Sequence, residues 1–204
     1  MNSRGHWIAT AFLASWTLLG LTMVAAAFRP QEDWFRTGTG LGVEKLRLAV
    51  PDFQAVGMES NPLAERFNRV LWSDLEVSGI VELASKSFYP ATAPTTPEEL
   101  RAEEWATLPV GAHMVVFGQL SGSGQSATVA VWVHDVRNPR APAVLAKRFR
   151  GEGTEAGIRR LAHELADEFV LRVSGGLPGI AQSRIAFVSD RSGGPQVYRV
   201  PVAG

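Results

Sequence analysis

The stretch HMVVFGQLSGSGQSATVAVWVHDV, residues 113–136, decides the fold of this chain. Its two ends, 113–120 and 126–136, are rich in valine and aromatic residues, and the segment SGSGQ lies between them. Two runs of strand-forming residues joined by a short glycine-containing segment predict a β-hairpin. The next run, residues 143–151, follows the turn NPRAP and predicts a third strand of the same meander.

An amphipathic helix is expected on each side of this meander in the sequence, over residues 61–78 and 154–173. The first begins with Asn61 as its N-cap and Pro62 at the first helical position, and it ends before Gly79. Thr154 caps the second helix. Each helix has one apolar face, formed by Leu63, Phe67, Val70, Leu71 and Leu75 in the first and by Ile158, Leu161, Leu165 and Phe169 in the second.

Further elements are expected before the meander. Residues 45–53 alternate between apolar and polar side chains and predict a strand, as do residues 80–85, whereas residues 97–108 predict a short helix. This order of strands and helices predicts an α/β fold, with an N-terminal mixed-sheet domain and packed helices over residues 45–174.

The first 27 residues predict a signal peptide. Arg4 precedes an uncharged run over residues 8–27, and Ala25-Ala26-Ala27 fits a cleavage site before Phe28. A run of this length is also long enough for a retained membrane anchor, which is the alternative. Because hydroxyl side chains dilute the run and no twin arginine precedes it, we favour Sec export to the periplasm with cleavage.

Composition excludes several classes of function. Lysine plus arginine and aspartate plus glutamate both number 20, so no net field attracts nucleic acid. There is no cysteine, which excludes disulfides, thiolate metal sites, a cysteine nucleophile and a lipid-modified N-terminal cysteine. His113, His134 and His163 have no metal-ligand spacing or nucleophile motif beside them. We therefore expect no catalytic residue, no metal site and no cofactor.

Residues 28–44 predict a flexible N-terminal arm. The arm is polar and glycine-rich, yet Trp34 and Phe35 are adjacent within it. A solvated segment seldom carries two neighbouring aromatic residues without a use. The two rings either dock on the domain that follows or bind a partner.

The C-terminal part divides in two. The glycines and proline of residues 175–180 predict a linker, and residues 181–204 predict two strands around a tight turn. Because a lone hairpin cannot bury its apolar face, we expect its valines and aromatic residues to be exposed.

Three stretches together resemble the TolB family. They are LAVPDF followed by NPLAERFNRVLWSDLEVSGIVELASKSFYP, then HMVVFGQLSGSG with VHDVRNPRAPAVLAKRFR, and finally RRLAHELADEFVLRVSGGLPGIAQSRIAFVSDRSGGPQVYRV. The resemblance covers residues 45–204. It implies a non-enzymatic periplasmic component of the Tol-Pal system, in which an α/β domain precedes a six-bladed β-propeller.

The resemblance implies that residues 181–204 are a truncated first propeller blade. The family's repeat has an S-D-R-x-G turn between two strands, which here is IAFVSDRSGG before PQVYRV. Asp190, Arg191 and Gly193 are then structural residues of the blade turn. Asp190 accepts turn amides, Arg191 pairs with a carboxylate, and Gly193 and Gly194 supply positive φ.

The resemblance also implies two protein partners. TolA engages the extreme N-terminus of mature family members, which corresponds here to Asp33, Trp34, Phe35, Arg36 and Thr37. Pal binds the propeller, so its site is expected on blades that this chain lacks. The chain would thus be peripheral to the membrane through protein partners, and would link TolA to Pal in support of envelope integrity and cell division.

Two other functions compete with this one. A fragment of a propeller-containing peptidase would need a nucleophile elbow, and the sequence contains none. A periplasmic ligand-binding domain would use a pocket over the sheet.

Cleavage of the predicted signal peptide can be measured directly. Mass spectrometry of the chain isolated from the cell envelope should find Phe28 as the first residue, because the cleavage site lies after Ala27. Intact Met1 in the inner-membrane fraction would show instead that the uncharged run is a retained anchor.

Overall fold

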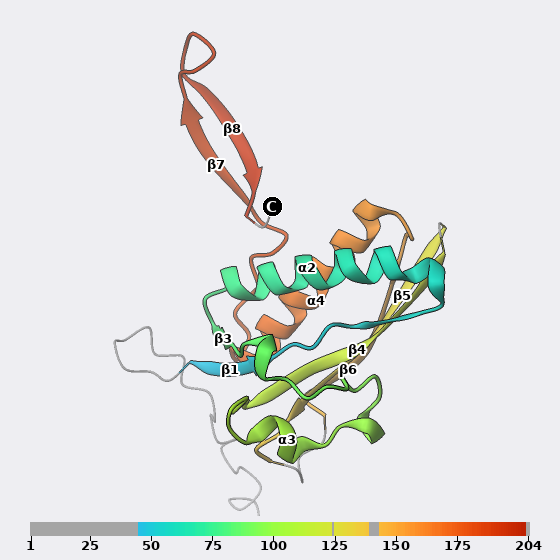
Figure 1. Cartoon of the computed structure of the whole chain (residues 1–204). Coiled ribbons are helices and arrows are strands. Elements are labelled where there is room, and N and C mark those ends of the chain that lie inside the picture. The colour runs from blue at the N-terminus through green and yellow to red at the C-terminus, as the bar shows by residue number, and fades with distance from the viewer. Residues whose placement is uncertain (1–44, 124, 139–142, 203–204) are drawn as a thin grey trace, which may run out of the picture. The chain divides into compact units, whose positions relative to one another are not determined.

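The computed structural model describes residues 45–123, 125–138 and 143–202, so the predicted signal peptide lies outside the described residues. Within them, the main sheet has six strands in the order β3-β1-β4-β5-β6, with β2 also paired to β4 (Figure 1). The strands are β1 (Leu46–Ala49), β2 (Gln54–Val56), β3 (Val81–Leu83), β4 (Met114–Ser123), β5 (Ser126–Asp135) and β6 (Leu145–Gly151). The first three pair in parallel and the last three pair antiparallel, which confirms the predicted mixed sheet.

The predicted hairpin is confirmed and lies at the centre of the sheet. Strands β4 and β5 pair without a break from Met114 opposite Asp135 to Ser123 opposite Ser126. Successive residues of a strand point to opposite faces. The odd-numbered valines of β5, from Val129 to Val133, therefore point to one face, where each is at most 1% exposed.

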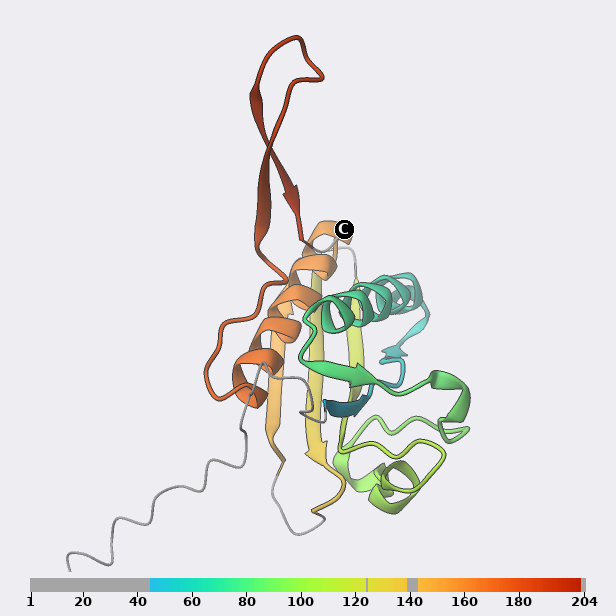
Figure 2. The same cartoon turned by 90° about the vertical axis from the view of Figure 1, so that its left-hand side faces the viewer.

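Helices α2 (Asn61–Val77) and α4 (Glu155–Val173) cover that face (Figures 1 and 2). The predicted apolar faces are confirmed, except that Leu63 is only half-buried. Gly79 follows α2 with φ of 68°, and the Thr154 hydroxyl accepts the Gly157 N–H at 3.1 Å, as expected for their caps.

The predicted start of the first helix was wrong. Asn61 is already helical, and the N-cap is Ser60. The Ser60 hydroxyl does not cap the helix; it accepts the N–H of Gly122 at 3.0 Å and lies 2.9 Å from the carbonyl oxygen of Val56. This residue therefore ties the start of α2 to β2 and to the tip of β4.

Among the described residues, the opposite face of the sheet is covered only in part, by the segment between β3 and β4. The helix predicted over 97–108 is shorter than expected: a 3-10 turn, η3 (Pro97–Glu99), precedes the five-residue α3 (Ala102–Ala106), because Leu100 is extended. Trp105 of α3 is 1% exposed and packs with Phe117 of β4 in a small apolar cluster.

The strand predicted over 45–53 is also interrupted. It ends at Ala49, and a second strand that the sequence did not predict, β2, begins at Gln54. Pro51 lies between them and has no N–H to donate to a ladder. The chain therefore needs other hydrogen-bond partners across this interruption.

Two side chains supply those partners. The Tyr89 hydroxyl accepts the Val50 N–H at 2.9 Å and donates to the Ala84 carbonyl at 2.8 Å. Burial raises the pKa of Tyr89 to about 12, which keeps this donor protonated. The Asn68 carboxamide of α2 accepts the Phe53 N–H at 2.9 Å and donates to the Phe53 carbonyl at 3.2 Å. Asn68 thus satisfies both backbone groups that a neighbouring strand would otherwise satisfy.

A buried polar pair joins the two long helices. Asp74 of α2 is 3% exposed, and its Oδ2 lies 2.7 Å from Nδ1 of His163 on α4. The predicted structural role of His163 has a physical basis in this contact, because each group provides the hydrogen-bond partner that the other needs in the interior.

The segment after α4 leaves the helix and then contacts it again. Gly175 and Gly176 have φ of 73° and 107°, while the Ala181 N–H donates to Asp167 Oδ1 of α4 at 2.8 Å. The end of the predicted linker is therefore held by α4. No helix among the described residues is long and apolar enough to cross a membrane.

Strands β7 (Arg184–Ser189) and β8 (Gln196–Pro201) form a separate two-stranded sheet. The expected exposure of its apolar residues is confirmed, since five of them are 41% to 70% exposed: Ile185, Phe187, Val188, Val197 and Val200.

Replacing Asn68 tests whether its hydrogen bonds to Phe53 stabilise the interruption between β1 and β2. Asn68→Ala should lower the free energy of unfolding by about 1–3 kcal/mol, because it leaves both backbone groups of Phe53 without a partner. The matched control is Asn61→Ala, at an exposed position of the same helix, which should change the free energy by about 0.5 kcal/mol or less. Urea unfolding measures both, and equal losses would contradict the role given to Asn68.

Candidate functional site

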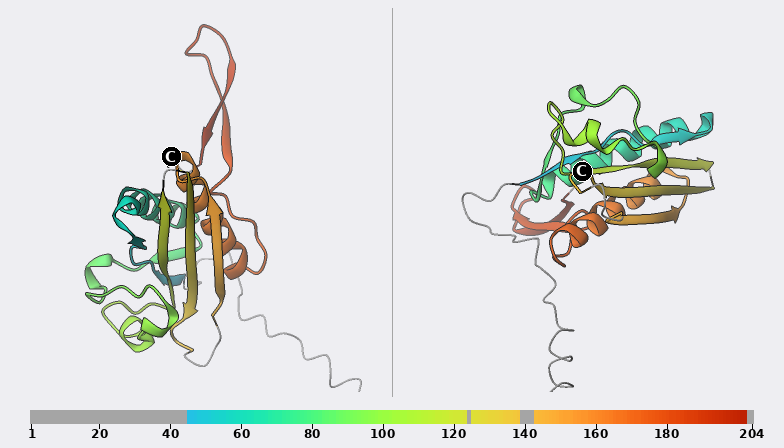
Figure 3. Two further views of the ribbon diagram at one scale, coloured as in Figure 1. Left: turned by 90° about the vertical axis from the view of Figure 1, so that its right-hand side faces the viewer. Right: turned by 90° about the horizontal axis from the view of Figure 1, so that it is seen from below.

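The face of the sheet that points away from α2 and α4 is the first candidate surface, and we call it the open face. Figure 3 shows β4, β5 and β6 in front of α4, with the α3 segment at one end only. The strand register assigns to the open face the residues Gln119, Thr128, Ala130, Trp132, Arg148 and Arg150. This surface combines a large aromatic ring, polar side chains and two cations.

Trp132 is the largest side chain of the open face. It is half-buried and stacks on Phe117, with ring centroids 6.1 Å apart and an angle of 22° between the planes. Phe117 is in turn fully buried in the cluster around Trp105. Trp132 thus stacks on a fully buried ring while part of its own side chain stays accessible, which suits it to act as an anchor for a partner.

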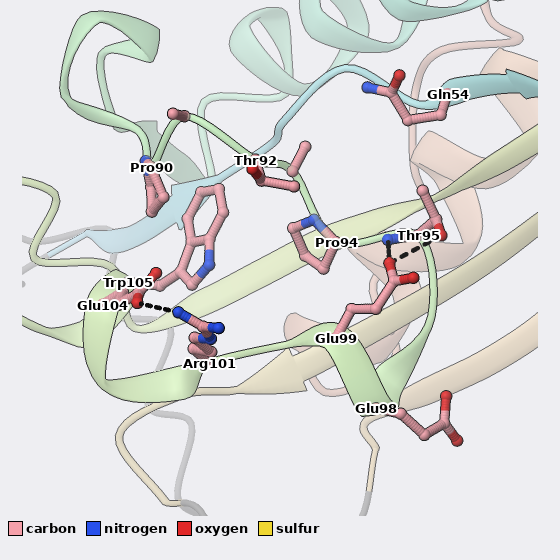
Figure 4. A pocket seen from close by; sticks show the side chains of 12 residues that line it. Gln54, Pro90, Thr92, Pro94, Thr95, Glu98, Glu99, Arg101, Glu104 and Trp105 are labelled. Atoms are coloured by element: carbon pink, nitrogen blue, oxygen red, sulfur yellow. Dashed lines mark hydrogen bonds and ion pairs between the residues drawn. The ribbon is translucent and has the colours of Figure 1, made fainter.

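A hollow of about 820 Å³ lies beside the α3 segment, between Gln54 of β2 and the loop around Pro94 (Figure 4). Glu99 Oε2 accepts the Thr95 N–H at 2.8 Å and its hydroxyl at 2.9 Å, which fixes the loop. The Thr95 backbone and hydroxyl hydrogen bonds lower the pKa of Glu99. A glutamate held in its ionised form is a poor proton donor, so this acid suits ionic recognition better than general acid catalysis.

Two of the described histidines make polar contacts within the fold, and the third packs near an aromatic ring. His113 Nδ1 lies 3.3 Å from the backbone nitrogen of Arg47, and His163 pairs with Asp74. His134 is half-buried on the open face, 5.5 Å from the Phe117 ring. In the part of the chain that the structure describes, no three histidine, aspartate or glutamate side chains form a metal-binding group.

The arm residues predicted to bind a partner, Asp33, Trp34, Phe35, Arg36 and Thr37, lie outside the described residues. Their role stays a prediction.

The residues predicted for the blade turn lie between β7 and β8. Gly193 has φ of 91°, and its N–H donates to the backbone carbonyl of Asp190 at 3.0 Å. Gly194 was expected to share the positive φ and does not, since one left-handed residue suffices for this turn. Arg191 has no ion-pair partner among the described residues, so the carboxylate predicted for it is not found there.

Sequence reasoning missed the open face. Trp132, Arg148 and Arg150 lie on two strands that were predicted correctly, but their shared face depends on the register between the strands. The alternation within 126–136 contained a usable signal, because the odd positions from 129 to 133 all hold valine, whereas Thr128, Trp132 and His134 occupy even positions.

Comparisons with known proteins find relatives that match the α/β domain. Residues 39–141 match the family model of the TolB amino-terminal domain. A Tol-Pal system protein TolB of Ruegeria sp. (strain TM1040) is 32% identical over 176 residues, which are 85% of this chain and 38% of that protein. Another, of Cereibacter sphaeroides (strain ATCC 17025), is 28% identical over 148 residues, or 72% of this chain and 32% of that protein.

A solved structure supports the fold. The crystal structure of TolB from Acinetobacter baumannii matches with a TM-score of 0.58 at 20% sequence identity, over 79% of this chain and 37% of that one. The chain thus spans less than two fifths of the length of these three relatives.

The buried Nε2 of the half-buried His134 should make the fold sensitive to acid. Its Nε2 is buried without a hydrogen-bond partner among the described residues, and burial lowers its pKa. Above about pH 6.5 this histidine is neutral in both states. Below it the unfolded chain takes up a proton that the folded chain resists, so stability falls until the pH reaches the folded pKa.

The measurement compares the free energy of unfolding at about pH 7.5 and about pH 5.5. His134→Gln should lose less stability than the native chain over this interval, because the titrating group is gone. An equal loss in both proteins would place the acid sensitivity elsewhere.

Proposed function

The chain belongs to the TolB amino-terminal domain family, and from this membership we propose that it is a non-enzymatic, protein-binding component of the Tol-Pal system of the cell envelope. The observation that carries the proposal is the family match over residues 39–141, joined to a fold shared with a solved TolB. Export by a cleaved Sec signal would bring the chain to the periplasm.

The described surface supports binding rather than catalysis. The acids and histidines that the fold brings into contact are engaged in structural pairs, as Asp74 is with His163 and Glu99 with Thr95. The open face, in contrast, presents the supported ring of Trp132 beside the exposed side chains of Arg148 and Arg150. Exposed aromatic and arginine side chains on a rigid sheet are the composition of a protein-binding surface.

Two partners follow from the family. We assign the TolA contact to the arm, with Trp34 and Phe35 as its anchors. We assign the Pal contact to propeller blades, of which the β7–β8 hairpin would be the beginning. The exposed valines and aromatic rings of that hairpin support this assignment, because a blade strand packs its faces on neighbouring strands and blades.

The TolA contact is tested by Trp34→Ala combined with Phe35→Ala. The double variant should bind the purified C-terminal domain of TolA at least about tenfold more weakly, because two aromatic anchors are lost. Its melting temperature should stay unchanged. The matched control is Phe88→Ala, which removes a half-exposed aromatic ring from the described domain and should leave TolA binding intact.

Calorimetric titration and a thermal melt measure the two properties. Unchanged TolA affinity of the double variant, or a melting temperature several degrees lower, would show that the two rings pack on the domain and would contradict the proposal.

A further inference from the structure

Strand β6 is an edge of the sheet with a defined set of free backbone groups. It pairs with β5 and with no other strand among the described residues. The Val136 N–H donates to the His113 carbonyl, so the even-numbered residues of β5 direct their backbone groups to β4. The β6 residues opposite these even-numbered residues therefore direct their own backbone N–H and C=O groups away from β5, to the free edge. These partners are Ala146, Arg148 and Arg150.

The side chains along this edge form two different rows. Arg148 and Arg150 lie on the open face, are exposed, and have no ion-pair partner among the described residues. Lys147 and Phe149 face α4 instead. There Lys147 is neutralised by Glu168 at 2.9 Å and lies over the Phe149 ring at 4.9 Å.

A groove of about 540 Å³ lies along the edge and is lined by β6, by α4 and by Pro178, Gly179 and Gln182 of the segment after α4. Leu171 contributes an exposed apolar surface to it. Two acids of this groove are engaged, since Asp167 accepts the Ala181 N–H and Glu168 binds both Lys147 and Arg172, whereas the third, Glu164, has no ion-pair partner among the described residues. The unpaired positive charges of the edge therefore lie on the open face, whereas Glu164 and Asp167 keep the groove negative, so acidic side chains of a bound segment are attracted to the open face and repelled from the groove.

We propose that the free edge of β6 binds an extended acidic segment of a partner protein, which adds to the sheet as an antiparallel strand. The outward backbone groups of Ala146, Arg148 and Arg150 pair with the segment, as in other strand-addition complexes. Residues of the segment directly opposite the arginines share their face, so these positions carry the acids. The alternate residues point into the groove beside Phe149 and Leu171 and are apolar.

The same arginines would also discourage pairing between two copies of the chain, since charges on an edge strand oppose such association. That role alone predicts that no peptide binds and that removal of the arginines causes self-association. The proposed site uses no residue of the arm, so it does not depend on the assignment of TolA.

The probe is a fluorescein-labelled peptide of alternating valine and glutamate, slightly longer than β6, and its binding is followed by fluorescence anisotropy. We expect saturable binding that weakens as salt is added. Arg148→Glu with Arg150→Glu should weaken it at least about tenfold, because charge-assisted contacts of this strength are lost. The control double variant, Arg69→Glu with Arg199→Glu, changes the charge equally on exposed residues away from β6 and should bind as the native chain does.

N-methylation of the probe tests the strand addition without altering the protein. In an antiparallel pair the glutamates opposite Arg148 and Arg150 make the backbone hydrogen bonds, so methylating the glutamate nitrogens should abolish binding. Methylating the valine nitrogens, which point away from β6, should leave it intact.

Three results would overturn the proposal: no saturable binding, equal effects of the two methylated peptides, or self-association of the Arg148→Glu, Arg150→Glu variant without any peptide binding by the native chain. Trp34→Ala with Phe35→Ala should bind the probe normally, so a failure here is distinguishable from a failure of the TolA assignment.

Discussion

The antiparallel pairing of β4 with β5 is the interaction on which the rest of the structure depends. It is the longest ladder of the sheet, and its two faces carry different sets of side chains. On one face, the valines of β5 pack against α2 and α4. On the other, Phe117 and Trp132 pack against the α3 segment, and the uncovered part of this side is the open face. A slip of one residue in this register would exchange the two faces, placing Trp132 among the helices and the valines in water.

Beside this ladder, the parallel side of the sheet is incomplete and is held by side chains. The hydroxyl of Tyr89, the carboxamide of Asn68 and the hydroxyl of Ser60 each satisfy backbone groups where β1 or β2 lacks a neighbour. Such contacts matter because a buried backbone group left without a partner costs about 1–3 kcal/mol. Asn68 lies on α2, so the same contact also sets the position of the helix over the sheet.

The two proposed binding surfaces lie at places where the sheet ends. Among the described residues, the α3 segment covers only the part of the open face near β1, and β6 has no second neighbour because the chain turns into α4 instead of adding a strand. Both surfaces meet at Arg148 and Arg150, which belong to the edge by their backbone and to the open face by their side chains. The described part of the domain thus places exposed arginines near a half-buried tryptophan at one edge of the sheet, a composition that suits the proposed protein-binding role.

The sequence by itself determined the hairpin of 113–136, the apolar faces of both long helices, the glycine after α2, the cap at Thr154 and the exposed hairpin at the end, because each depends on local periodicity or on the conformational preference of single residues. It also contained the residues of the family resemblance. Only the tertiary structure decided the remaining features. These are the interruption after Ala49, the new strand β2, the roles of Asn68, Ser60 and Tyr89, the Asp74–His163 pair and the free edge of β6. Each of these joins groups far apart in the chain, such as Asp74 and His163, and no local pattern records which distant partner will satisfy a polar group or which strand will be left without a neighbour.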